Sequence, residues 1–122
     1  MSLPRKSRKG YYDLKYVLQV AGTDEGFVLE MVKYFVQNTP VVLQRLKKYC
    51  REENWNDLAA EAHKFAPGLS FLGITVLEEK IRRVEDCATE GARHESLPRL
   101  VEEIDKTGNE VVNVLKQDFS LE

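Results

Sequence analysis

Of the two histidines in this 122-residue sequence, His63 has the surroundings best suited to chemistry. An imidazole ring carries a nitrogen lone pair that can act as a nucleophile near neutral pH. Its neighbours on one side of a helix, at spacings of three, four and seven, are all small: Ala59, Ala60, Ala66, Pro67 and Ser70. Exposed helix surfaces usually carry long charged side chains, so this pattern indicates a flat surface on which a partner protein could bring a reactive group close to the ring. The alternative is a histidine that is simply solvated.

A second pattern in the same segment predicts the direction in which His63 points. Apolar residues recur at steps of four, three, four and three, which is the period of a buried helix face: Leu58, Ala62, Phe65, Leu69 and Leu72. At 100° per residue, His63 lies about 160° from Phe65, the centre of that face. We therefore expect the His63 side chain to point away from the core.

Pro67 gives an independent argument for the same placement. Its missing N–H is the one that would bond the carbonyl of His63, so the helix should bend or loosen there. The freed carbonyl then needs water or a partner, which is tolerable only at the surface. Pro40, inside the preceding helical pattern, predicts a kink or a short break near residues 38–40.

The rest of the chain repeats helical periods and shows almost no alternation of period two. We expect a short helix that starts at Asp13 and ends at Gly22, followed by four long helices. The expected starts of the long helices are Thr23 or Asp24, Asn54 or Asn56, Thr75, and the residue after Ser96, and two of these helices end at Gly73 and Gly91. These amphipathic helices with short connections predict an all-α fold: an antiparallel up-and-down four-helix bundle with a short additional N-terminal helix.

Composition and charge restrict the function classes. The length fits one bundle domain over residues 11–119, with a flexible basic tail or linker remnant at 1–10 and a short tail at 120–122. Eighteen basic and twenty acidic residues give a net charge of -2, which provides no general attraction for nucleic acid or an anionic membrane. Cys50 and Cys87 are too few and too far apart for a disulfide framework or a metal site, and we interpret both as core or near-core thiols.

No apolar run in the sequence approaches the roughly 18 residues needed to cross a bilayer, and the basic N-terminal segment lacks the apolar stretch of a signal peptide. We therefore expect a cytoplasmic protein with no membrane contact. The second histidine, His94, lies in a polar turn without small neighbours and is expected to be solvated.

The segment around His63 resembles the signature of histidine-containing phosphotransfer (HPt) domains. The match rests on Ala62-His63-Lys64-Phe65 and on the Leu72-Gly73 pair at the spacing of that signature. The resemblance covers residues 12–115, because Tyr12-Asp13-Leu14, the turn at residues 22–25 and Thr39-Pro40 also look like the family.

This resemblance implies a phosphorelay intermediate. His63 would accept a phosphoryl group from an aspartyl phosphate on a response-regulator receiver domain and pass it to another receiver aspartate, with Nε2 as the expected nucleophile. The Mg²⁺ and its acidic ligands would belong to the receiver, so the chain itself needs no cofactor and no metal. A hybrid sensor histidine kinase is a further implied partner, and we expect the domain to be a monomer.

The sequence departs from the usual family pattern after the histidine. Many members carry Lys three positions on and Gly four positions on, whereas this chain has Ala66 and Pro67. Lys64 could neighbour the phosphoryl group instead, but it points about 100° away from His63, and it could equally be a solvated lysine. Ser70 could donate a hydrogen bond to a phosphoryl oxygen or merely keep the surface small.

The absent lysine motivates an alternative function, a helical interaction module of HPt-like fold whose histidine is not phosphorylated. A kinase dimerisation fragment that phosphorylates itself is disfavoured, because the 122 residues contain no ATP-binding segment. A hydrolase or metalloenzyme is disfavoured because one exposed histidine has no evident acid partner or fellow ligand.

Overall fold

The computed structural model describes residues 3–7, 9–90 and 94–121, and over these ranges the fold is all-helical. The helices are α1 (Lys15–Ala21), α2 (Glu25–Arg51), α3 (Trp55–Phe71), α4 (Thr75–Glu90) and α5 (Leu97–Asp118), with a 3₁₀ turn, η1, at His94–Ser96. In the described ranges the only extended pairing is an isolated bridge between Lys6 and Asp13. The all-α part of the expected fold class is therefore confirmed.

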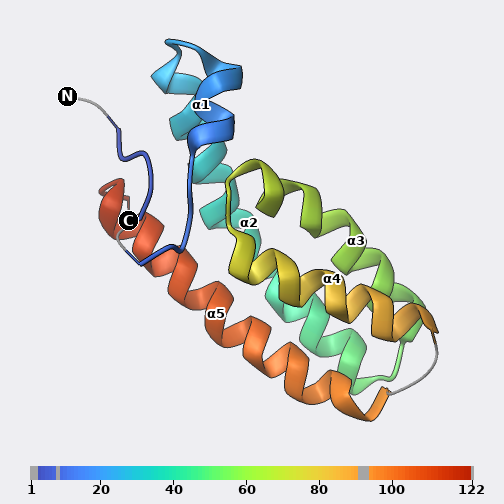
Figure 1. Cartoon of the computed structure of the whole chain (residues 1–122). Coiled ribbons are helices and arrows are strands. Elements are labelled where there is room, and N and C mark those ends of the chain that lie inside the picture. Colours follow the sequence, from blue (N-terminus) through green and yellow to red (C-terminus); the bar gives the residue numbers. More distant parts are fainter. Residues whose placement is uncertain (1–2, 8, 91–93, 122) are drawn as a thin grey trace.

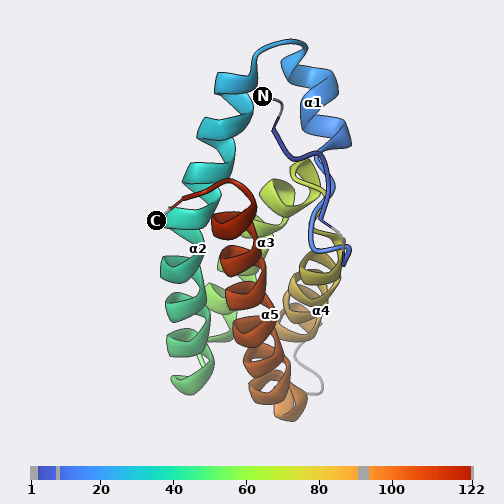
Figure 2. The same cartoon turned by 90° about the vertical axis from the view of Figure 1, so that its left-hand side faces the viewer.

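The four long helices lie side by side (Figures 1 and 2), with α2 and α4 each packed against both α3 and α5. Each contributes an apolar stripe to one shared core, and the fully buried members include Val32, Leu46, Leu58, Leu69, Ile81, Val84 and Ile104. The short α1 lies at the end of the bundle where α2 begins, and Tyr16 of α1 packs edge-on against Phe71 at the end of α3, with ring centroids 5.5 Å apart.

Several helix boundaries follow the predicted capping residues. The Asp24 carboxylate accepts a hydrogen bond from the Phe27 N–H (3.0 Å) at the start of α2. The Asn54 side chain accepts one from the Asp57 N–H (3.3 Å) at the start of α3. Side-chain acceptors at these positions satisfy N–H groups that have no partner inside the helix.

Three other predicted boundaries need correction or fall outside the described residues. The helix α1 starts at Lys15 with Leu14 as its cap, so it begins later than the predicted start at Asp13, whose carboxylate accepts a hydrogen bond from the Lys15 N–H (3.0 Å). The helix α4 starts at Thr75, but the carbonyl that accepts its first hydrogen bond, from the Glu78 N–H, belongs to Ile74, so the cap lies one residue earlier than expected. The predicted stop at Gly91 lies outside the described residues.

Of the kink or short break predicted near Pro40, the break is absent, because α2 runs uninterrupted from Glu25 to Arg51. Packing of α2 against both α3 and α5 outweighs the local cost of the proline. Pro67 likewise lies inside an uninterrupted α3, and it is exposed, as expected.

The described part of residues 1–10 makes hydrogen bonds with the residues that follow it. Ser7 is buried, and its hydroxyl oxygen accepts hydrogen bonds from the N–H groups of Tyr11 and Tyr12. The Leu14 N–H donates to the Arg5 carbonyl (2.7 Å), which fixes the segment against the start of α1. At the other terminus, the Leu121 N–H donates to the Lys116 carbonyl (2.8 Å).

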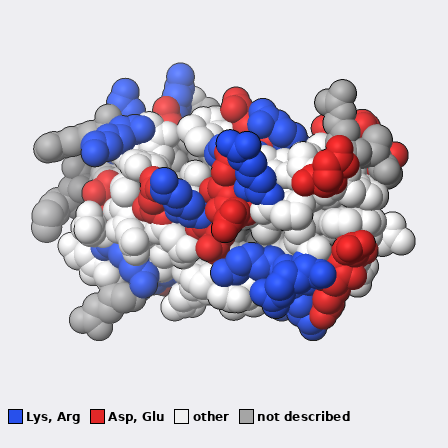
Figure 3. All heavy atoms as spheres, turned by 90° about the horizontal axis from the view of Figure 1, so that it is seen from below, with Lys and Arg blue, Asp and Glu red and all other residues white. Residues whose placement is uncertain are grey.

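The surface carries charges of both signs. On the face shown in Figure 3, acidic and basic side chains lie interspersed, and this face offers no continuous basic surface to a polyanion. Within the described ranges, no helix is both long and apolar enough to cross a membrane.

Candidate functional site

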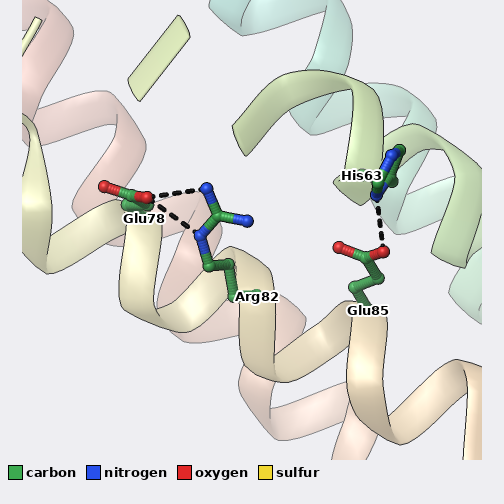
Figure 4. A network of polar contacts seen from close by, with 4 residues as sticks. All are labelled: His63, Glu78, Arg82 and Glu85. Atoms are coloured by element: carbon green, nitrogen blue, oxygen red, sulfur yellow. Dashed lines mark hydrogen bonds and ion pairs between the residues drawn. The ribbon is translucent and has the colours of Figure 1, made fainter. Parts of the chain in front are cut away.

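His63 lies in the middle of α3 with its side chain 75% exposed. The outward direction predicted from the helical period is therefore correct. The ring leans over the contact between α3 and α4 rather than standing free in solvent (Figure 4).

The partner of the ring is Glu85 on α4, whose Oε2 lies 2.7 Å from His63 Nδ1. An ionised carboxylate can only accept hydrogen bonds, so this contact places the ring hydrogen on Nδ1. In the neutral ring the lone pair then lies on Nε2. The Glu85 side chain is only 25% exposed, which limits the rotamers open to it and holds the ring in one orientation.

The turn between α3 and α4 sets the register that brings these residues together. Gly73 adopts a φ of 63°, and the Ile74 N–H donates to the Leu69 carbonyl (2.9 Å), which reverses the chain in a few residues. His63 precedes Gly73 by ten residues and Glu85 follows it by twelve, so the two lie opposite each other in the paired helices.

Glu85 was missed by sequence reasoning, although a signal existed. Near-equal spacing from the turn predicts a contact once α3 and α4 are known to pack as a hairpin. The sequence alone did not show which of the acidic residues on α4 would face α3.

The predicted docking residues differ in their exposure. Ala60, Pro67 and Ser70 are exposed on the side of α3 that carries His63, and Ala59 is half-buried. Ala66 is fully buried, so its expected place on the open surface is wrong. The reason is that α3 packs against α4 as well as α2, and its buried arc is wider than the single stripe seen in the sequence.

Lys64 is exposed and lies on the opposite flank of His63 from Glu85. It lines a groove between α2 and α3 together with Arg45 and Glu61, which form an ion pair of 3.5 Å. Its side chain therefore starts on the side of α3 that faces α2. Ser70 lies two helical turns beyond His63 on the exposed face.

A second polar pair on α4 lies near the site (Figure 4). Arg82 donates from Nε and Nη2 to the Glu78 carboxylate, with both distances 2.9 Å. Sequence reasoning did not single out either residue.

His94 differs from the solvated residue that was predicted. Its ring packs against Trp55 with centroids 4.4 Å apart, and its Nε2 is buried without a hydrogen-bond partner among the described residues. The indole at the start of α3 supplies apolar surface that a polar-looking turn in the sequence does not reveal.

Both cysteines are free and belong to the core or its edge, in agreement with their interpretation. Burial raises the pKa of the Cys50 thiol. Over the described ranges, no three His, Cys, Asp or Glu side chains come together in a group that could hold a metal ion.

Comparison with protein families gives a match to the Hpt domain over residues 30–117, a span that contains His63, Arg82 and Glu85. The chain belongs to the Hpt domain family. As an Hpt domain it acts in phosphotransfer within two-component signalling, where domains of this family interact with receiver domains. No curated protein sequence and no solved structure matches the chain.

Proposed function

We propose that this Hpt domain is a phosphorelay intermediate that accepts a phosphoryl group on His63 from a receiver aspartyl phosphate and passes it to another receiver aspartate. The observation that carries the proposal is the exposed ring whose Nδ1 is bound by Glu85, because this contact leaves Nε2 as the free nucleophile. Such transfer depends on placement and charge neutralisation more than on covalent machinery, so a sparse site is sufficient.

The transfer step balances as a displacement at phosphorus. The lone pair of His63 Nε2 forms the N–P bond while the P–O bond to the receiver aspartate breaks, and the bonding electrons remain on the departing carboxylate. Because Nδ1 keeps its hydrogen, the phosphorylated ring becomes positively charged. The Glu85 carboxylate at 2.7 Å stabilises this charge, as a carboxylate does for a catalytic imidazolium.

Transfer to the next receiver reverses these changes. A carboxylate oxygen of the accepting aspartate forms a bond to phosphorus, the N–P bond breaks, and its electron pair returns to Nε2. The departing group is then a neutral imidazole with its hydrogen still on Nδ1, shared with Glu85. The same contact therefore serves both directions.

The exposed small residues beside His63 are the proposed docking surface for the receiver, which would bring its own Mg²⁺. This surface is formed by Ala60, Pro67 and Ser70, with Ala59 at its edge. The proposal includes the antiparallel up-and-down arrangement of α2–α5, which the alternating directions of consecutive helices in Figures 1 and 2 support. Contact of Lys64 or Ser70 with the phosphoryl group is also part of the proposal.

The test is to mix the protein with receiver domains that carry phosphoaspartate and to look for acid-labile, base-stable label. The label should be absent from His63→Gln and retained in His94→Gln, the matched variant of the second histidine. Label that survives His63→Gln would overturn the assignment. Receiver binding without any label on the wild-type protein would favour the non-phosphorylated interaction module instead.

A further inference from the structure

We propose that Arg82 of α4 binds the phosphoryl group on His63 and is the positioning cation of this site. The inference rests on the proposed function of His63. It accounts for the excess of negative charge that a phosphoryl group on His63 would create near the Glu85 carboxylate.

The excess of negative charge arises because the phosphoryl group is added to a ring that Glu85 already contacts. A phosphoryl group on Nε2 carries a charge of about -1.5 to -2 near neutral pH. It would lie on a ring whose other nitrogen already contacts a carboxylate. The single positive charge of the phosphorylated ring does not balance both negative groups, and the remaining repulsion between them is stronger where solvent is partly excluded. A cation within reach of the phosphoryl oxygens would offset it.

Arg82 is the candidate for this cation because of its place on α4. It precedes Glu85 by three residues, so the two lie on one side of α4, about 4.5 Å apart along the helix axis. In Figure 4 the Arg82 and Glu85 side chains leave the same side of α4, and the Arg82 guanidinium is turned toward Glu78. Because α3 and α4 run in opposite directions, Arg82 lies toward the end of α3 that carries Pro67 and Ser70.

The guanidinium is held in place while retaining a donor for a ligand. Nε and Nη2 both donate to Glu78, whereas Nη1 has no acceptor among the described residues. The Glu78 side chain is 17% exposed and that of Arg82 is 51% exposed. The carboxylate is therefore held by its surroundings, while the guanidinium is accessible to a ligand. A planar guanidinium suits phosphoryl oxygens, which it can bind through two N–H groups.

The other described cations of α3 and α4 are less well placed. Lys80 forms an ion pair with Glu103 of α5 at 3.3 Å, on the far side of α4. Lys64 lines the groove toward α2. Arg83 lies about 100° further round α4 than Arg82, beyond the side that faces α3.

The first measurement needs no receiver. Phosphoramidate phosphorylates exposed histidine directly, and the His63 phosphoryl signal in a ³¹P NMR titration is identified as the one missing from His63→Gln. A nearby cation favours the dianion, so Arg82→Gln should raise the phosphoryl pKa and Arg82→Lys should restore much of the difference. The matched control Arg83→Gln should behave as the wild type does.

Glu78→Gln separates phosphoryl binding from a merely structural role. This variant breaks the same ion pair as Arg82→Gln but frees the guanidinium, so it should lower the phosphoryl pKa. Shifts of the same sign in both variants, or an Arg82→Gln titration equal to that of Arg83→Gln, would overturn the proposal.

The second measurement is the rate of transfer from a phosphorylated receiver. Loss of one charge-assisted hydrogen bond in Arg82→Gln should slow it about tenfold. A rate equal to that of Arg83→Gln would contradict the proposal. If no receiver ever labels His63, the proposed function fails, whereas the phosphoramidate titration still decides the role of Arg82.

Discussion

Among the described residues, the contact between His63 on α3 and Glu85 on α4 is one of four in which a carboxylate meets a basic or imidazole side chain of a neighbouring helix. The others are Arg45–Glu61 between α2 and α3, Lys80–Glu103 between α4 and α5, and Lys47–Asp105 between α2 and α5. The candidate nucleophile therefore belongs to the contact between α3 and α4. A carboxylate on the neighbouring helix orients the ring, although the His63 side chain itself is exposed.

Glu85→Gln should slow phosphoryl transfer to His63 by about tenfold or more, because a neutral amide does not offset the positive charge that develops on the ring. The rate is measured with a phosphorylated receiver in rapid-quench experiments. The control is Asp86→Asn, which neutralises the adjacent exposed carboxylate. Equal rates in the two variants would show that Glu85 does not assist the ring.

His63→Gln should abolish transfer with little effect on folding. The side chain is 75% exposed, and ion pairs at such exposure contribute about 0 to 1 kcal/mol to stability. Thermal unfolding followed by circular dichroism should therefore give a Tm within about 5 °C of the wild-type value. A much larger loss would mean that His63 is a structural residue and that loss of label in this variant is uninformative.

The sequence predicts those parts of the fold that are determined by a few neighbouring residues. It does not predict those that are determined by packing between helices. Asp24, Asn54 and Gly22 act within one turn of the chain, and their positions were predicted correctly. The uninterrupted helix through Pro40 could not be predicted in this way, because neighbouring helices stabilise it and a local rule sees only the missing N–H.

The site shows the same division. The direction of His63 follows from the helical period, which is a property of α3 alone. The contact with Glu85 and the burial of Ala66 depend on where α4 lies against α3, which the sequence pattern of either helix leaves open. The folded position of Ser7 likewise depends on hydrogen bonds from Tyr11 and Tyr12, which composition does not reveal.

Gly73→Ala should be far more destabilising than Gly22→Ala. Both glycines have a φ of 63°, which costs an L-residue about 1 to 2 kcal/mol. A Cβ at Gly22 would meet nothing within 4 Å, whereas one at Gly73 would lie 2.0 Å from the Asp13 carbonyl oxygen. Urea unfolding of both variants separates the backbone cost from the steric cost. Similar losses would show that the segment before α1 can move aside freely.

Tyr12 should make folding stability depend on alkaline pH. Its hydroxyl donates to Asp118 Oδ2 at 2.6 Å, and burial together with this hydrogen bond raises its pKa above the ordinary value. Its contribution is fully present below about pH 10, where an unfolded tyrosine is protonated, and is lost as the pH rises further because only the unfolded phenol ionises.

Tyr12→Phe should therefore lower the free energy of unfolding by about 1.5 kcal/mol at pH 7. Above pH 10 the free energy of unfolding of this variant should decline less steeply with pH than that of the wild type. Urea unfolding between pH 7 and 11 measures both effects. Tyr34→Phe, at a side chain that is 63% exposed, is the control and should keep the wild-type slope. An unchanged slope in Tyr12→Phe would show that another group dominates the alkaline transition.

Ala60→Glu should slow transfer from a phosphorylated receiver without changing the Tm. Ala60 is exposed one turn before His63, so a glutamate there adds bulk and negative charge where the receiver and its phosphoryl group approach. Asn113→Glu places the same charge on an exposed position of α5, which packs against α2 and α4, and should leave the rate unchanged. Ala66→Glu is unsuitable for this purpose, because its buried carboxylate should unfold the bundle. If Ala60→Glu and Asn113→Glu transfer at the same rate, the receiver docks on a surface other than the small residues around His63.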